Sequence, residues 1–135
     1  MSNSRTFDAL VALANIQAAS GSNDKKALLA KYKDMGELMF ALKIAYDPYL
    51  RTGIGLKKLG KTIRNGHVGP VELDMAMVYD YFKNNPTGSG ADVAFAHKFI
   101  AQFSATQKVQ ELAMQLVTKT LKIGVTAKTL NKVYG

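Results

Sequence analysis

The sequence predicts an all-α fold, a compact domain of about six to seven helices, and three observations support this prediction. Apolar residues recur every three or four positions over most of the chain, which is the spacing of one buried helix face. No segment keeps the alternation of apolar and polar residues that is typical of a half-buried strand. Glycine, proline and capping residues separate the periodic segments, at residues 20–23, 47–48 and 85–90.

The first three helices are expected over residues 5–20, 22–34 and 36–46. Serine and glycine at 20–23 stop the first helix and provide a cap for the second. Gly36 separates the second helix from the third. Pro48 ends the third, because the residue before a proline avoids the α region.

Four more helices are expected over residues 70–84, 89–104, 106–122 and 126–133. Pro70 suits a first helical position, where its missing N–H group is not needed. The loop at 85–90 ends this helix and precedes the next one. Gly124 is expected to end the long helix before it, as a residue that readily takes positive φ at a helix C-terminus. Thr126 is then a suitable N-cap for the last helix.

The composition predicts one globular domain, residues 1–135, with an anionic partner. Its hydrophobic content of 47% and its length are sufficient for a buried core. The net charge is +8, which is typical of proteins that bind nucleic acid or another anionic surface, although a basic protein with merely solvated charges has the same balance. There is no cysteine, which excludes disulfides and thiolate metal sites. The chain has no signal-peptide pattern and no run of 18 apolar residues, so we expect no membrane partner.

Two basic stretches contain no acidic residue. Residues 112–135 hold four lysines around Gly124 and the helix start at Thr126. Residues 48–71 hold five cationic residues and several glycines. Helix N-termini and glycine-rich backbone offer N–H groups to anions, and lysines add charge. Both stretches are therefore predicted to bind a phosphate backbone, with a solvated loop as the alternative for the earlier one.

The earlier stretch also contains a P-loop pattern. Gly55-Leu56-Lys57-Lys58-Leu59-Gly60-Lys61-Thr62 matches G-x-x-x-x-G-K-[ST]. That motif requires a buried strand before the loop and a parallel α/β sheet around it. Residues 47–53 are not a hydrophobic strand. A P-loop nucleotide-binding protein is therefore the less favoured alternative.

The end of the chain resembles a known family. Leu121-Lys122-Ile123-Gly124-Val125-Thr126, followed by Lys128-Thr129-Leu130-Asn131-Lys132-Val133, resembles the helix–glycine–helix element that closes the N-terminal DNA-binding domain of ATP-dependent DNA ligases, phage type. Residues 16–26, residues 38–49 and Thr87-Gly88 resemble earlier parts of that domain, so the resemblance covers roughly residues 10–135. It implies a monomer that binds double-stranded or nicked DNA during DNA replication or DNA repair. The catalytic ligase domains of a parent chain would be its other partners, in the cytoplasm of a bacterium or a phage-infected host cell.

The predicted DNA-binding residues are basic, hydroxyl-bearing or glycine residues: Arg51, Lys57, Lys58, Lys61, Arg64, Thr87, Gly88, Lys119, Lys122, Gly124, Thr126, Lys128, Thr129 and Lys132. No catalytic residue, metal site or cofactor is predicted. The family's Lys-x-Asp-Gly adenylylation motif is missing, and Lys33-Asp34-Met35-Gly36 does not match it. ATP and Mg²⁺ are therefore implied for the parent enzyme alone. A stand-alone helical DNA-binding accessory protein is the alternative.

Overall fold

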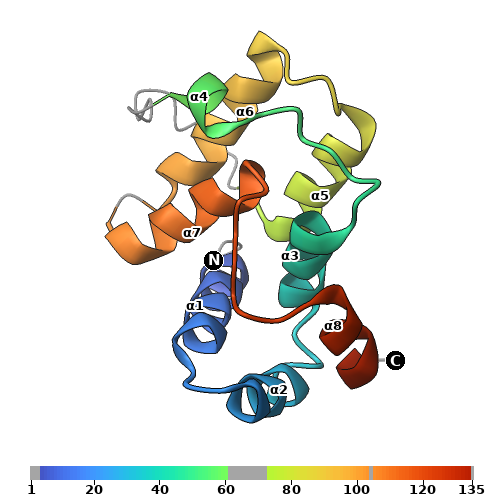
Figure 1. Ribbon diagram of the computed structural model, residues 1–135. Helices are drawn as coiled ribbons and strands as arrows, with labels where there is room; N and C mark the ends of the chain where they lie inside the picture. The colour runs from blue at the N-terminus through green and yellow to red at the C-terminus, as the bar shows by residue number, and fades with distance from the viewer. Residues whose placement is uncertain (1–3, 61–72, 104, 135) are drawn as a thin grey trace.

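The computed structural model describes residues 4–60, 73–103 and 105–134, and eight helices lie within them (Figure 1). Their bounds are α1 Ser4–Ala18, α2 Ser22–Lys31, α3 Gly36–Tyr46, α4 Leu56–Leu59, α5 Met75–Asn84, α6 Gly90–Ala101, α7 Gln107–Val117 and α8 Ala127–Tyr134. No described residue lies in a strand. The all-α prediction is confirmed.

Three helices form the centre of the molecule. α1, α3 and α7 pack against one another, α5 packs on α3, and α6 packs on α7. α2 and α8 pair at one end, while α4 lies on α6 at the other end (Figure 1). The core side chains come from every helix, and those fully enclosed include Leu10, Leu13, Ile16, Leu38, Ile44, Phe82, Phe99, Leu112 and Leu116. None of the helices in the described ranges is long and apolar enough to span a bilayer.

The starts of α5 and α6 have side-chain caps. Asp74 accepts a hydrogen bond from the Met77 N–H at 2.8 Å and begins α5. Ser89 and Asp92 form a capping box at the start of α6. The predicted start of a helix at residue 70 is wrong in the described part of the chain, because Leu73 and Asp74 are not helical. Pro70 itself lies outside the described residues.

The one-turn helix α4 is a feature that periodicity did not reveal. Its Leu59 is buried against α6, and the Leu59 carbonyl lies 2.8 Å from Nε2 of the buried His97. A single turn is too short to show a repeating apolar face, and isolated turns are unstable. Contact with α6 therefore accounts for this helix.

The predicted end of the long C-terminal helix at Gly124 is also wrong. α7 ends at Val117, and Lys119 takes the left-handed conformation with φ of 57°. The Thr120 N–H donates to the Gln115 carbonyl at 2.9 Å, and the Lys119 N–H to the Leu116 carbonyl at 3.1 Å. These two bonds define a Schellman motif, in which glycine is the usual left-handed residue. A residue with a Cβ atom is destabilised by about 1–2 kcal/mol in the left-handed conformation.

Hydrogen bonds of the Lys119 side chain account for a lysine at this position. Its Nζ donates to the carbonyl oxygens of Asp47 and Leu50, each at 2.6 Å, and so ties the end of α7 to the connection between α3 and α4. Burial lowers the pKa of the Lys119 ammonium; the Arg51 charge lowers it further, while the Asp47 carboxylate opposes the shift. Charge-assisted hydrogen bonds to carbonyls offset the cost of this partial burial.

Two substitutions at Lys119 separate backbone strain from the side-chain tether. Lys119→Ala removes both hydrogen bonds and keeps the strained conformation, whereas Lys119→Gly removes the bonds and the strain together. We expect both variants to be less stable than the wild type. The glycine variant should exceed the alanine variant by about 1 kcal/mol in free energy of unfolding. Urea denaturation followed by circular dichroism measures this, and equal stability of the two variants would contradict the assigned conformation.

Candidate nucleic-acid interface

The structure sorts the predicted DNA-binding residues into two groups at opposite ends of the molecule (Figure 1). The loop group lies near α4 and the start of α6, and consists of Arg51, Lys57, Lys58, Thr87 and Gly88. The C-terminal group surrounds the start of α8, and consists of Lys122, Gly124, Thr126, Lys128, Thr129 and Lys132. Lys119 lies on the segment between them. Lys61 and Arg64 lie outside the described residues.

A direct contact between two glycines builds the loop group. Gly53 and Gly88 both have positive φ, 70° and 66°. A Cβ atom added to Gly53 would lie 2.7 Å from the Gly88 nitrogen, and one added to Gly88 would collide with the Gly53 carbonyl oxygen. The Lys58 Nζ would be 3.0 Å from the same Gly88 Cβ, which places its ammonium over this glycine. Two segments distant in the sequence therefore meet backbone to backbone beneath a lysine.

A buried carboxylate, that of Asp92, organises the Thr87 side of this contact. It accepts hydrogen bonds from the hydroxyls of Thr87 and Tyr81, each at 2.7 Å, and from the Ser89 N–H at 3.1 Å. The Thr87 hydrogen bond is the largest cause that lowers the pKa of Asp92, and the bonds from Tyr81 and Ser89 add to it. Burial, the hydrogen bond to Asp92 and the Asp92 charge together raise the pKa of Tyr81 to about 12. Thr87 and Gly88 thus have structural roles inside the loop, and their contact with DNA stays a prediction.

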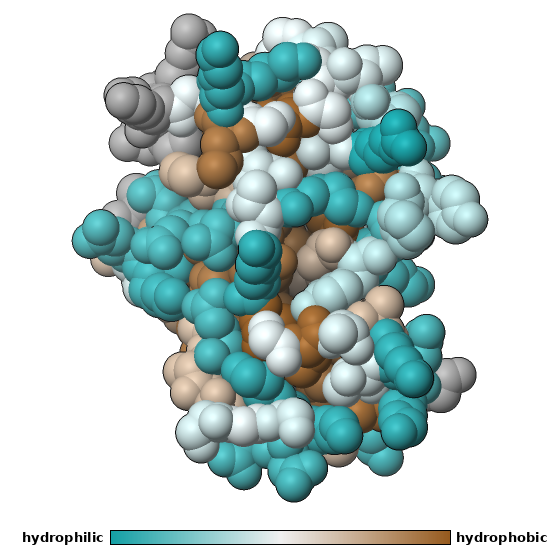
Figure 2. Space-filling view, viewed as in Figure 1, coloured by the Kyte–Doolittle hydropathy of each residue, from teal (hydrophilic) through white to brown (hydrophobic). Residues whose placement is uncertain are grey.

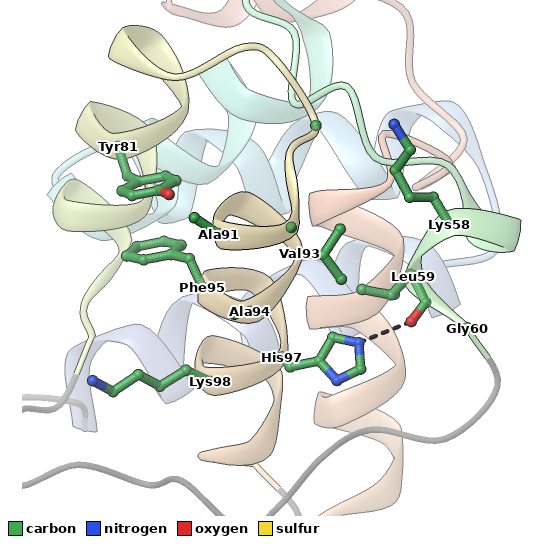
Figure 3. Close-up of a pocket in the computed structure, with 12 residues that line it drawn as sticks. Lys58, Leu59, Gly60, Tyr81, Ala91, Val93, Ala94, Phe95, His97 and Lys98 are labelled. Carbon is green, nitrogen blue, oxygen red and sulfur yellow. Dashed lines mark hydrogen bonds between the residues drawn. The ribbon is translucent and has the colours of Figure 1, made fainter.

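A cavity of about 960 Å³ lies beside α6, between α4 and the Tyr81 ring (Figure 3). Figure 3 shows Tyr81 and Phe95 on one side of α6, and Lys58, Leu59 and His97 on the other. The two aromatic rings stack with centroids 3.8 Å apart. The described lining is apolar and cationic and includes no carboxylate. It therefore offers no pair of acidic groups for general acid–base catalysis.

Gly124 lies at the centre of the C-terminal group. Its φ is 82°, so the predicted left-handed conformation is confirmed, although it occurs in an extended segment rather than at a helix end. A Cβ atom there would lie 2.8 Å from Cε of Lys25. The Lys25 Nζ donates to the carbonyls of Ile16 and Gln17 at 2.8 and 3.0 Å, where it neutralises the C-terminal end of α1. Gly124 thus provides the space that the Lys25 side chain needs.

Side chains from α1 and α3 hold the segment that leads into α8. The Gln17 amide donates to the Lys122 carbonyl at 2.8 Å, and the Tyr46 hydroxyl to the Val125 carbonyl at 2.8 Å. Lys108 donates to the Gln17 side-chain oxygen at 2.9 Å, which brings a further cation to this end. Sequence reasoning missed Lys25 and Lys108 as members of this cationic surface. Lys25 lies in residues 16–26, which resemble part of the ligase domain, and this resemblance was the signal that could have included it.

Thr126 begins α8 as predicted. Its hydroxyl oxygen accepts a hydrogen bond from the Thr129 N–H at 3.2 Å. The N–H groups of Ala127 and Lys128 have no acceptor among the described residues, and both residues are exposed. Lys122, Lys128 and Lys132 are exposed as well. Cationic side chains and unpaired amides therefore face solvent at one helix start, which is a favourable environment for an anion.

The described residues contain no cluster of three histidine, aspartate or glutamate side chains that could hold a metal ion. The chain matches no known family model, no characterised protein and no solved structure. The interpretation of this surface therefore rests on its own geometry and charge.

The glycine contact in the loop group gives a prediction about stability. Gly53→Ala and Gly88→Ala each place a methyl group against backbone atoms in a left-handed conformation. We expect each to lower the free energy of unfolding by about 2 kcal/mol or more. Gly55→Ala is the matched control in the same loop, because nothing lies within 4 Å of its added Cβ and its φ is negative. Denaturation that left Gly88→Ala as stable as Gly55→Ala would show that the two loops do not touch.

Proposed function

We propose that this chain binds duplex DNA through the phosphate backbone, as the N-terminal DNA-binding domain of an ATP-dependent DNA ligase. The observation that carries the DNA-binding part of the proposal is the start of α8, whereas the ligase part rests on the resemblance of residues 121–133. There a left-handed glycine, a threonine cap, unpaired amides and the exposed Lys122 and Lys128 occur together. The segment from residue 112 to residue 135 contains no acidic residue to compete with a phosphate.

The distribution of charge supports an extended contact along the phosphate backbone of DNA. Lys119 and Arg51 lie close enough for their charges to interact, and both line the same hollow as Gly53 and Gly55. The segment after Lys119 then leads to the C-terminal group. Figure 2 shows hydrophilic residues at both ends of this face, around a partly apolar strip. Two cationic ends on one molecule fit an extended polyanion better than a single small anion.

The side chains of the C-terminal group favour contact with phosphates over readout of base edges. Lysine, threonine and backbone amides bind phosphate oxygens, whereas sequence is read mainly by arginine, asparagine and glutamine at base edges. The C-terminal group contains lysines, threonines and a glycine. Sealing of a nick would belong to the catalytic domains of the parent enzyme. The role proposed for this chain is to hold the substrate.

The first experiment measures the affinity for a nicked and an intact duplex as a function of salt concentration. If ~4–6 phosphates are neutralised, a plot of log K against log salt should have a slope of about −4 to −5. Binding should depend little on base sequence, because the contacts are to the backbone. Absence of binding to any duplex at low salt, or affinity that does not change with salt, would refute the proposal.

The second experiment locates the main contact. Lys122→Ala/Lys128→Ala should weaken DNA binding by roughly 1–2 kcal/mol at moderate salt and make the salt slope shallower. Stability should be unchanged, because both side chains are exposed. Lys33→Ala/Lys83→Ala removes two exposed charges outside both groups and is the matched control. Lys57→Ala/Lys58→Ala tests the loop group; a loss confined to that variant would place the main contact there instead.

A further inference from the structure

Tyr49 is the most exposed large hydrophobic side chain in the described part of the chain. Its side chain is 93% exposed, compared with 53% for Leu56 and 39% for Met77. Its hydroxyl has no hydrogen-bond partner among the described residues. Aromatic side chains contribute most when they are buried, so an aromatic ring held fully in solvent contributes nothing to the core. The fold gives no structural reason for tyrosine at this position.

The backbone under Tyr49 is held rigidly. The Tyr49 N–H donates to the Asp47 carboxylate at 2.9 Å, and the Leu50 N–H donates to the Asp47 carbonyl at 3.2 Å. Pro48 restricts its own φ within this turn. The Lys119 ammonium binds the carbonyls on both sides of the turn, those of Asp47 and Leu50. A partner would therefore meet a ring whose backbone is already ordered, which reduces the entropic cost of binding.

The surroundings of Tyr49 are cationic. Arg51 is exposed two residues along the chain. Lys119 and Arg51 line a shallow hollow of about 380 Å³ that continues from Pro48 to Gly53 and Gly55. The connection that carries Tyr49 projects at the edge of the molecule, between the two basic groups (Figure 1). A ring beside cations is the arrangement that binds a base or a sugar with its flanking phosphates, whereas an apolar protein partner needs a wider apolar patch.

We propose that Tyr49 is an aromatic contact residue that packs on a deoxyribose of bound DNA, or on a base face left open at a nick, while Arg51 pairs with an adjacent phosphate. This inference rests on the proposed DNA-binding function. It adds a contact that does not depend on charge, and it assigns Lys119 the role of a positioning residue for the Tyr49 turn.

Two substitutions test the contribution to affinity. Tyr49→Ala should weaken binding to a nicked duplex about tenfold, which lies within the range that alanine substitution gives for base–aromatic stacking on single strands. Its salt slope should equal that of the wild type, because no phosphate contact is removed. Tyr49→Phe, which keeps the ring, should bind like the wild type. Met77→Ala is the control for loss of another exposed apolar side chain, and the thermal stability of all variants should be unchanged.

A fluorescence experiment tests the contact directly. The chain has no tryptophan, so Tyr49→Trp introduces a single reporter, and Met77→Trp provides the control. Strong quenching of Tyr49→Trp by a nicked duplex indicates stacking on a base at the nick. A tenfold loss for Tyr49→Ala without strong quenching indicates packing on the sugar, and both results support the inference. If the wild type binds DNA, yet Tyr49→Ala binds equally well and the tryptophan signal is unmoved, the inference is overturned and the proposed function stands. If the wild type binds no DNA, both the inference about Tyr49 and the proposed function are refuted.

Discussion

The hydrogen bonds from Lys119 to the Asp47–Leu50 turn are the contact on which the relative placement of the two basic groups depends. Lys119 ends α7 in a conformation that a side chain resists, and its ammonium then reaches the turn after α3. One residue therefore sets both the direction in which the chain leaves α7 and the position of the turn that precedes the loop group. The segment from Thr120 to the start of α8 begins in that direction, and Gln17 and Tyr46 then hold it in place.

Lysines have more than one role in the described part of the chain. Lys25 and Lys119 are partly buried and have backbone carbonyls as partners, at the end of α1 and in the turn after α3. Carbonyl oxygens satisfy a buried ammonium without adding a negative charge to the surface. Lys122 and Lys128 are exposed beside them. Because Lys25 and Lys119 pair with neutral carbonyls, their positive charges are not cancelled. Carboxylate partners would have reduced the positive potential of the surface.

Sequence reasoning was most accurate where the signal is local. Thr126 as an N-cap and Gly124 with positive φ follow from residue type and the immediate neighbours, and both are confirmed. It failed where distant residues decide the outcome. Lys119 replaces glycine in a helix-ending motif because carbonyls about 70 positions earlier in the chain stabilise it. The contact of Gly53 with Gly88, which buries Gly88, could likewise not be predicted, because the two residues are far apart in the sequence; the predicted DNA contact of Gly88 stays a prediction.

The all-α class, the number of long helices, the acid-free basic stretches and the Thr126 cap were determined by the sequence alone, because each depends on spacing or residue type within a few positions. The tertiary structure decided which basic residues face solvent and which serve the fold. It placed Lys25 beneath Gly124, Lys58 over Gly88 and Tyr49 on a rigid exposed turn. These outcomes depend on hydrogen bonds and steric contacts between segments far apart in the chain, and residue spacing contains no information about them.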